Sequence, residues 1–221
     1  MEILLSAKNI SKTFQGRRVL DNIDIEINNA EIVAISGPSG AGKTTLLNIL
    51  STLDKPDESN KSSLIIDNEE IFSLGKNGLA KLRNQKIGFV FQFHELIPEL
   101  NVLENVCLPG WIKKDNDVKK KAEELLKYFG LEDFTNKKPL TLSGGEKQRV
   151  AIARSLVNNP KIIFADEPTG NLDSKNSKIL FDLFFKLRDD YNCSVVIVTH
   201  DEKSANICDR KLLIVDGKIK K

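Results

Sequence analysis

The chain has 221 residues, of which 40% are hydrophobic and 29% are charged. This length and composition are typical of one folded domain and exclude a disordered chain. The formal net charge of +2 offers no general argument for a nucleic-acid or anionic-membrane partner. No apolar run approaches the roughly 18 residues that a membrane-spanning helix needs. The N-terminal residues, with an acid at Glu2, do not predict a signal peptide.

The N-terminal part of the chain predicts strands around a glycine-rich turn. Ile23, Ile25 and Ile27 alternate with acidic side chains, which predicts a half-buried strand. Residues 31–36 form an almost continuous apolar run, typical of a buried parallel strand that ends at the turn. A helical pattern follows the turn over residues 45–53, and another buried strand is predicted over residues 86–92.

The middle of the chain predicts helices. Residues 115–129 carry one apolar stripe at helical spacing, and Gly130 is placed to close that helix. A second helical pattern covers residues 146–157. We therefore expect residues 93–158 to form a mainly helical subdomain.

Strands return in the last third of the chain. They are predicted over residues 161–165, 194–199 and 211–215, with a helix over residues 177–188. The predicted fold class is α/β, with a parallel sheet interrupted by the helical insertion. We expect a single domain over residues 1–221, whose α/β core consists of residues 1–92 and 159–221.

The glycine-rich turn has the pattern of a phosphate-binding loop. It fits G-x-x-x-x-G-K-[ST] at every fixed position, between a predicted strand and a predicted helix. Glycines allow successive backbone N–H groups to point at a phosphate, and the helix dipole favours the same anion. Lys43 is expected to reach the β- and γ-phosphates of a nucleotide, and the Thr44 hydroxyl to ligate Mg²⁺. The loop consists of Gly37, Pro38, Ser39, Gly40, Ala41, Gly42, Lys43 and Thr44.

Two acids, Asp166 and Glu167, follow the apolar strand that begins near residue 161. A carboxylate at a strand end beside a phosphate loop is suited to hold Mg²⁺, so Asp166 is expected to do so. Glu167 is expected to face the terminal phosphate and to act as general base toward the attacking water. Without the phosphate loop, two solvated acids at a strand end would be an equally good interpretation.

The sequence Leu-Ser-Gly-Gly-Glu at residues 142–146, followed by Lys-Gln-Arg, resembles the signature of ABC ATPases. The resemblance covers nearly the whole chain. It implies a RecA-like P-loop NTPase core with an N-terminal antiparallel edge sheet and a helical subdomain. It also implies ATP hydrolysis with Mg²⁺ in a head-to-tail homodimer, where each signature closes over the other subunit's ATP. The signature residues expected to bind nucleotide are Ser143, Gly144, Gly145 and Glu146.

Further positions match motif residues of that family. Phe14 stands where an aromatic ring stacks on adenine, although Tyr is commoner there. Gln92 matches a glutamine that contacts Mg²⁺ or the water, and His200 a histidine that contacts the γ-phosphate. Asp173 is expected to face the opposite subunit, and Thr45 completes the nucleotide-binding set. The expected catalytic residues are Lys43, Gln92, Glu167 and His200, and the expected metal ligands are Thr44, Gln92 and Asp166.

Two short segments resemble particular branches of the ABC ATPases. Residues 92–106 and 165–173 resemble lipoprotein-releasing (LolD-like) and macrolide-exporter (MacB-like) ATPases, and the first branch more closely. The resemblance implies a translocase subunit, peripheral on the cytoplasmic face of the inner membrane, that works with integral membrane subunits and has no nucleic-acid partner. The alternatives are a macrolide- or peptide-exporting complex, and a cell-division or signalling ATPase that drives a membrane partner without transport.

Residues 92–106 are unusually apolar for a connecting segment. Leu96 and Ile97 either form an exposed socket for a helix of the membrane partner or pack in the core of the helical subdomain. His94 is expected to be a surface residue of this segment. For Trp111, core packing is favoured over partner contact.

Overall fold

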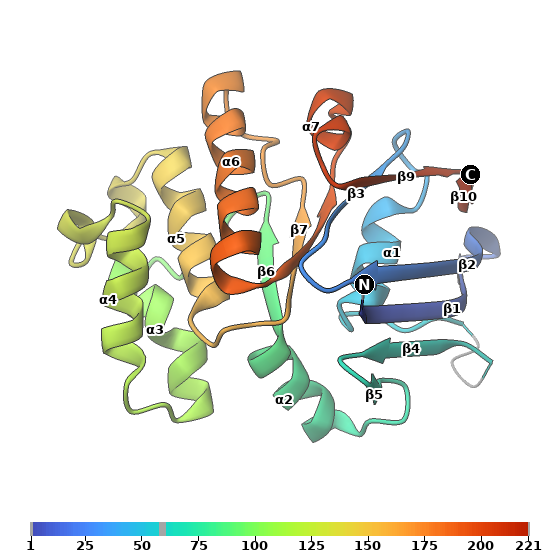
Figure 1. Ribbon diagram of the computed structural model, residues 1–221, viewed down its shortest axis with the longest axis horizontal. Coiled ribbons are helices and arrows are strands. Elements are labelled where there is room, and N and C mark those ends of the chain that lie inside the picture. Colours follow the sequence, from blue (N-terminus) through green and yellow to red (C-terminus); the bar gives the residue numbers. More distant parts are fainter. Residues whose placement is uncertain (1, 58–60, 221) are drawn as a thin grey trace.

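The computed structural model describes residues 2–57 and 61–220. A six-stranded sheet with the order β10-β9-β3-β8-β7-β6 runs through its centre (Figure 1). Strands β9, β3, β8, β7 and β6 are parallel to one another, and β10 pairs antiparallel with β9. The strand bounds are β3 (Ile32–Ser36), β6 (Ile87–Phe91), β7 (Ile162–Asp166), β8 (Ser194–Val198), β9 (Arg210–Val215) and β10 (Lys218–Lys220).

The central strands are apolar along their length because both faces of the sheet are covered. Successive side chains of a strand point to opposite faces. In β7, Ile162 and Phe164 therefore belong to one hydrophobic cluster, whereas Ile163 and Ala165 belong to the other. β8 and β3 divide between the clusters in the same way.

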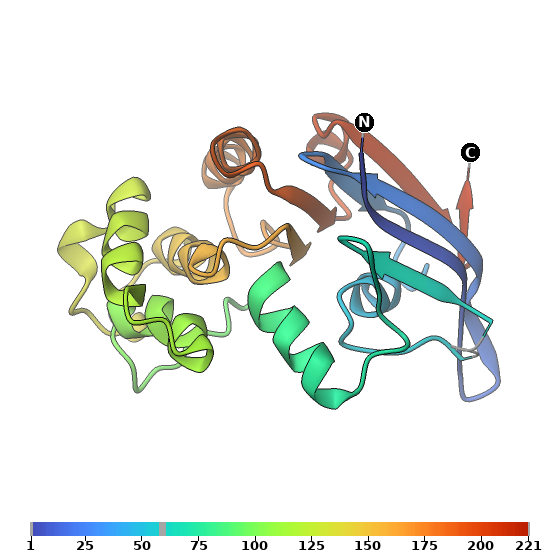
Figure 2. The ribbon, with the colours of Figure 1, turned by 60° about the horizontal axis from the view of Figure 1, so that its bottom comes forward.

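A second sheet, antiparallel and with the order β2-β1-β4-β5, packs beside the first (Figures 1 and 2). Ile23, Ile25 and Ile27 of its β2 are buried, as the alternating pattern predicts. They share a cluster with Leu46 and Leu47 of α1, on one face of the six-stranded sheet. The bounds are β1 (Ile3–Phe14), β2 (Arg17–Asn28), β4 (Ser63–Ile66), β5 (Glu69–Glu70) and α1 (Lys43–Leu50).

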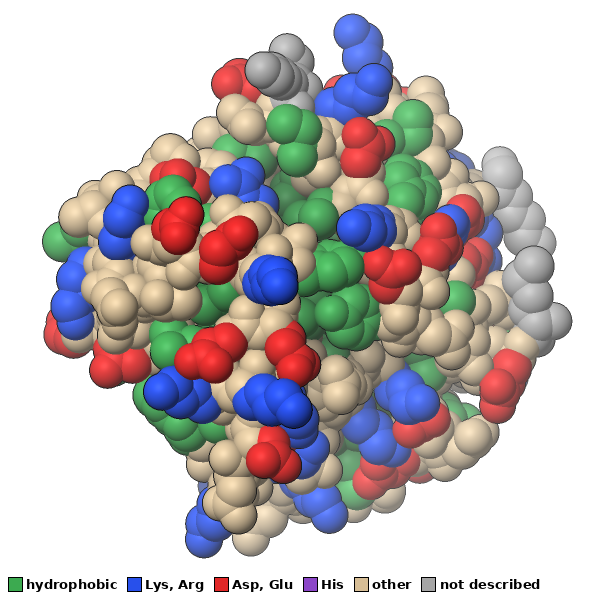
Figure 3. Space-filling model, turned by 60° about the vertical axis from the view of Figure 1, so that its left-hand side comes forward, with side chains coloured by type: hydrophobic (Ala, Val, Ile, Leu, Met, Phe, Trp, Pro, Cys, Tyr) green, Lys and Arg blue, Asp and Glu red, His purple; other side chains and the backbone are tan. Residues whose placement is uncertain are grey.

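The opposite face is covered by helices from the middle of the chain and by α6. On the side of the molecule shown in Figure 3, hydrophobic side chains gather near the centre among charged ones. The predicted α/β fold with an N-terminal antiparallel sheet and a helical part is confirmed, while the exact bounds 93–158 stay a prediction. The helices are α3 (Val102–Lys113), α4 (Val118–Tyr128), α5 (Gly144–Leu156) and α6 (Ser174–Tyr191), with two short 3-10 turns, η1 (Glu132–Phe134) and η2 (Pro139–Thr141).

Two helices have no counterpart among the sequence predictions. α2 (Lys76–Lys86) is mostly polar and buries only Leu82 fully, so it lacks an apolar stripe. α7 (Glu202–Asn206) is too short for periodicity to reveal. No helix within residues 2–57 and 61–220 combines the length and the apolar character needed to cross a membrane.

Trp111 contradicts its prediction. Its side chain is 46% exposed and belongs to neither hydrophobic cluster. Core packing is therefore the wrong interpretation, because α3 turns this position outward while Val106 and Cys107 face the core.

The contact between α3 and α4 yields a stability prediction. A Cβ atom at Gly110 would lie 2.1 Å from Cγ2 of Val118. Gly110→Ala should lower the free energy of unfolding by about 1–3 kcal/mol through overpacking, although alanine favours a helix by about 1 kcal/mol. Chemical denaturation measures the difference.

Gly78 of α2 is the matched control, because its added Cβ would meet only Leu74, at 3.4 Å. Gly78→Ala should leave the free energy of unfolding unchanged or raise it by up to about 1 kcal/mol. An equal gain in both variants would show that α3 and α4 are not in tight contact at Gly110.

Candidate functional site

The glycine-rich turn between β3 and α1 is wedged against two neighbouring strands. Gly37 has φ 147°, and a Cβ there would lie 2.1 Å from the carbonyl oxygen of Ile214. Gly42 has φ 101°, and its Cβ would lie 2.8 Å from both Val19 O and Leu20 Cδ2. Both positions therefore need glycine for conformation and for space.

Lys43, the first residue of α1, places a cation at the centre of this turn. Its Nζ donates hydrogen bonds to the carbonyl oxygens of Gly37 at 2.9 Å and Pro38 at 3.0 Å. The residue is only 9% exposed. The buried ammonium group and the N-terminus of α1 both favour an anion in the turn.

A cavity of about 420 Å³ opens over the turn. The structure brings Phe14 and Glu167 to its rim, as the sequence predicts for a nucleotide site. Arg17 also lies there, and it was missed by the sequence predictions. The signal was the turn at Gln15 and Gly16, because this hairpin pairs Arg17 with Phe14. The lining residues are Phe14, Arg17, Val19, Ser39, Gly40, Gly42, Lys43, Thr44, Thr45 and Glu167.

Thr44 and Asp166 bring two oxygen donors together. The Thr44 hydroxyl donates to Asp166 Oδ1 over 3.3 Å. Burial raises the pKa of Asp166; the hydrogen bond from Thr44 opposes this shift, and the charge of Glu167 adds to it. A hydroxyl and a carboxylate beside a phosphate-binding turn fit Mg²⁺, which takes oxygen ligands and commonly shares phosphate oxygens.

Glu167 and His200 face each other where β7 and β8 end. The Nδ1 atom of His200 lies 2.8 Å from Oε2 of Glu167, and the His200 N–H donates to the same oxygen over 3.4 Å. Glu167 has φ 46°, a left-handed conformation that is uncommon outside glycine. Its N–H donates to Val198 O at 2.9 Å, which anchors this conformation to β8.

Gln92 lies one residue beyond β6 and does not line the cavity. The Asn171 side chain donates to its carbonyl oxygen over 3.1 Å. A Cβ at Gly170 would lie 2.7 Å from Gln92 Nε2, so the glutamine amide touches the segment that follows Glu167. Its metal-ligand role stays a prediction.

The signature residues also lie outside the cavity of their own chain. Ser143 caps α5: its Oγ donates to Glu146 Oε2 at 2.7 Å and accepts from the Glu146 N–H at 3.4 Å. Hydrogen bonds from Ser143 hold the pKa of Glu146 below its usual value. Asp173 caps α6 by accepting from the Asn176 N–H at 2.8 Å. Contact of Ser143, Gly144, Gly145, Glu146 and Asp173 with a second subunit's nucleotide stays a prediction.

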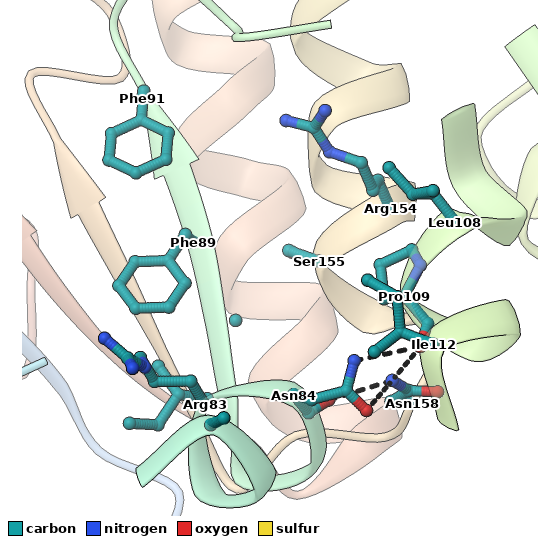
Figure 4. A pocket seen from close by; sticks show the side chains of 13 residues that line it. Arg83, Asn84, Phe89, Phe91, Leu108, Pro109, Ile112, Arg154, Ser155 and Asn158 are labelled. Atoms are coloured by element: carbon teal, nitrogen blue, oxygen red, sulfur yellow. Dashed lines mark hydrogen bonds between the residues drawn. The ribbon is translucent and has the colours of Figure 1, made fainter. Parts of the chain in front are cut away.

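A second depression, a largely apolar groove of about 430 Å³, lies between α2, β6, α3 and α5 (Figure 4). Phe89 and Phe91 of β6 stack with ring centroids 5.9 Å apart on one wall, and Ile112 lines the α3 side, 67% exposed. Leu96 is partly buried against the core cluster, which favours core packing over the socket at this residue. Ile97 is also partly buried but belongs to neither cluster, so its role stays a prediction. The open apolar surface is this groove, defined by Ala80, Arg83, Asn84, Ile87, Gly88, Phe89, Phe91, Leu108, Pro109, Ile112, Arg154, Ser155 and Asn158.

Comparisons with known proteins agree on one family. The family model described as ABC transporter matches residues 20–170. The lipoprotein-releasing system ATP-binding protein LolD of Bacteroides thetaiotaomicron is 50% identical over 99% of this chain and 100% of its own length. LolD of Aquifex aeolicus is 46% identical over 99% of this chain and 97% of its own. A solved dimeric ATP-binding cassette, bound to ADP and Pi in a post-hydrolysis state, is 44% identical with a TM-score of 0.87, covering 98% of this chain and 97% of that one.

Asp201, next to His200, yields a pH-dependent prediction. Its side chain caps α7 by accepting from the Lys203 and Ser204 N–H groups, and the Ser204 hydroxyl is the first cause that lowers its pKa. A depressed carboxylate pKa stabilises the fold above about pH 4 and loses this contribution as the pH falls further. Asp201→Ala should therefore cost about 1 kcal/mol of unfolding free energy at pH 7, and less below pH 4.

Urea unfolding at several pH values measures this difference. Asp201→Asn keeps a capping oxygen and should lose less at pH 7 than the alanine variant. Asp182→Ala, at an exposed position of α6, is the control. A loss at Asp201 that is independent of pH would exclude the carboxylate as its source.

Proposed function

The chain belongs to the ABC transporter family and is an ATPase, and we propose that it powers the release of lipoproteins from the inner membrane. The observation that carries the proposal is the near-half identity to LolD proteins over the whole length of both chains. Its place is then on the cytoplasmic face of that membrane, bound to integral membrane subunits.

The cavity over the glycine-rich turn is the ATP site in this proposal. Phe14 offers a half-exposed aromatic face to the adenine, and the backbone of residues 37–43 surrounds the β- and γ-phosphates. Lys43 leaves its own loop carbonyls for the phosphate oxygens, which as anions are stronger acceptors. Arg17 adds a second cation at the rim.

Glu167 is the general base in this mechanism. Its carboxylate accepts the proton of the attacking water, and His200 holds the carboxylate in place through the 2.8 Å contact. Thr44 and Asp166 would hold Mg²⁺, which would supply positive charge beside the phosphates. Gln92 reaches this edge from β6, whose last residue pairs with Asp166.

The active form in this proposal is a homodimer. Ser143 and the following glycines sit at the N-terminus of α5, where free N–H groups favour a phosphate, yet they lie outside their own cavity. In a head-to-tail dimer, Ser143 and these glycines would contact the ATP that is bound in the cavity of the second copy. The solved cassette with 44% identity is described as dimeric.

The groove is where the membrane partner docks in this proposal. An amphipathic helix buries its apolar side chains in such a depression. The groove is open, lined by Phe89, Phe91 and Ile112, and it borders Gln92 through β6. A helix seated there is placed to act on the site at the end of β6.

Reconstituted release tests the function. We expect membranes containing the complex and an acylated lipoprotein to release it to a soluble acceptor when ATP is added. Glu167→Gln should retain ATP binding, lose turnover by a factor of about 100 or more because the amide cannot accept the water's proton, and release no lipoprotein.

Two results would contradict these assignments. Normal hydrolysis by Glu167→Gln removes this residue from the role of base. An active wild-type complex that retains every lipoprotein while exporting a small molecule instead would assign the chain to the exporter branch.

Docking in the groove yields a separate prediction. Ile112→Ser removes one exposed apolar side chain from the groove wall, so the melting temperature of the isolated chain should hardly change. If a partner buries this side chain, the loss of about 1.5–3 kcal/mol should weaken assembly roughly tenfold or more. Ile207→Ser, at a residue 51% exposed outside the groove, is the control in detergent pull-downs. Equal assembly by both variants would place the docking surface elsewhere.

A further inference from the structure

The segment after β6, residues 92–97, is held at two ends by different parts of the molecule. At its start, the Gln92 carbonyl accepts a hydrogen bond from Asn171, four residues after Glu167 in the chain. Two residues further on, Arg154 of α5 binds the backbone of the segment. Its Nη2 donates to His94 O at 2.8 Å and its Nη1 donates to Glu95 O at 2.5 Å.

These two carbonyls belong to an unusual stretch of backbone. His94 has φ 64° and Glu95 has φ 48°, so two successive residues other than glycine are left-handed. Such conformations persist only where the surroundings hold them. The planar guanidinium suits this task because it presents several donors in a fixed fork, which a lysine lacks. The prediction that His94 is merely a surface residue is therefore incomplete.

The same arginine lines the groove. Figure 4 shows its guanidinium at the level of Phe91, where β6 ends, opposite the wall formed by that strand. One side chain thus borders the groove and holds the backbone two and three residues after Gln92. Arg83, another cation of the groove, instead donates to Thr52 O and, within the part of the chain that the structure describes, bonds to none of residues 92–97.

General anchoring of the segment is provided by another residue. Asn105 is fully buried and bonds Ile97 in both directions, accepting from its N–H at 2.8 Å and donating to its carbonyl at 3.0 Å. Asn105 does not line the groove. The segment is thus tied to α3 without Arg154, whose distinctive feature is that it touches both the groove and the left-handed turn.

We propose that Arg154 is the positioning residue through which a helix seated in the groove changes the place of Gln92. This inference rests on the proposed docking of the membrane partner. A seated helix that draws the guanidinium toward itself releases the carbonyls of His94 and Glu95. The left-handed turn then relaxes, and Gln92 moves relative to Asn171 and Gly170.

The first experiment uses the isolated chain, so it does not depend on the proposed function. Hydrogen exchange of the His94 and Glu95 amides, which bond to Phe91 O and Phe93 O, is compared in wild type, Arg154→Lys, Arg154→Met and Arg83→Met. We expect these amides to exchange at least fivefold faster in Arg154→Met, less so in Arg154→Lys, and at the wild-type rate in Arg83→Met. Unchanged exchange in Arg154→Met would overturn the proposal.

The second experiment uses the complex with its membrane subunits. The measured quantity is the kcat for ATP hydrolysis with the partner divided by the kcat without it. In Arg154→Met this ratio should move at least threefold toward one. The KM for ATP and the melting temperature should stay at their wild-type values. Arg154→Lys should be intermediate, and Lys127→Met, at an exposed position of α4 outside the groove and the ATP cavity, should keep the wild-type ratio. A wild-type ratio in Arg154→Met within an assembled complex would also overturn the proposal. Failure of the wild-type chain to assemble would instead contradict the proposed docking, and the exchange data would still decide whether Arg154 holds the turn.

Discussion

The close passage of the backbone at Gly37 and Gly42 is the constraint on which the rest of the site depends. With Ile214 O on one side and Val19 and Leu20 on the other, the turn has room for no side chain at either position. Its shape is therefore set by β9 and β2, which flank it. The shape of the turn in turn fixes the positions of the Lys43 ammonium and the Thr44 hydroxyl. Asp166 contacts Thr44 because β7 ends at the same edge of the sheet.

The central strands and the glycine-rich turn could be predicted from the sequence, because each is encoded by a short local pattern of residues. The strands before the glycine-rich turn and before Asp166 are apolar on both faces, and the turn between strand and helix has few possible uses. The fold class and the family followed from such local patterns. The roles of the individual site residues remain predictions, although the structure brings Phe14, Lys43, Thr44 and Glu167 around one cavity.

What the sequence did not predict depends on pairing between distant parts of the chain. Arg17 enters the site through the register of a hairpin, and the groove forms only where α2, α3 and α5 meet β6. α2 was missed because its surface is mainly polar and only Leu82 is fully buried. Trp111 was misjudged because a large aromatic residue is usually buried, and one chain does not reveal which of its surfaces a partner covers.

The strand order has a consequence for how the protein folds during its synthesis. β3 lies between β8 and β9, so Ile32 pairs with Val195 and Val33 with Arg210. The ribosome makes the chain from its N-terminus, and both neighbours of β3 lie near the C-terminus. β3 therefore cannot pair in its sheet until nearly all of the chain has been made. Throughout that interval a strand with two apolar faces is exposed to aggregation, a hazard that grows with the separation of pairing segments. The glycine-rich turn is thus translated early, but it acquires its shape only after β9, which flanks it, has been made.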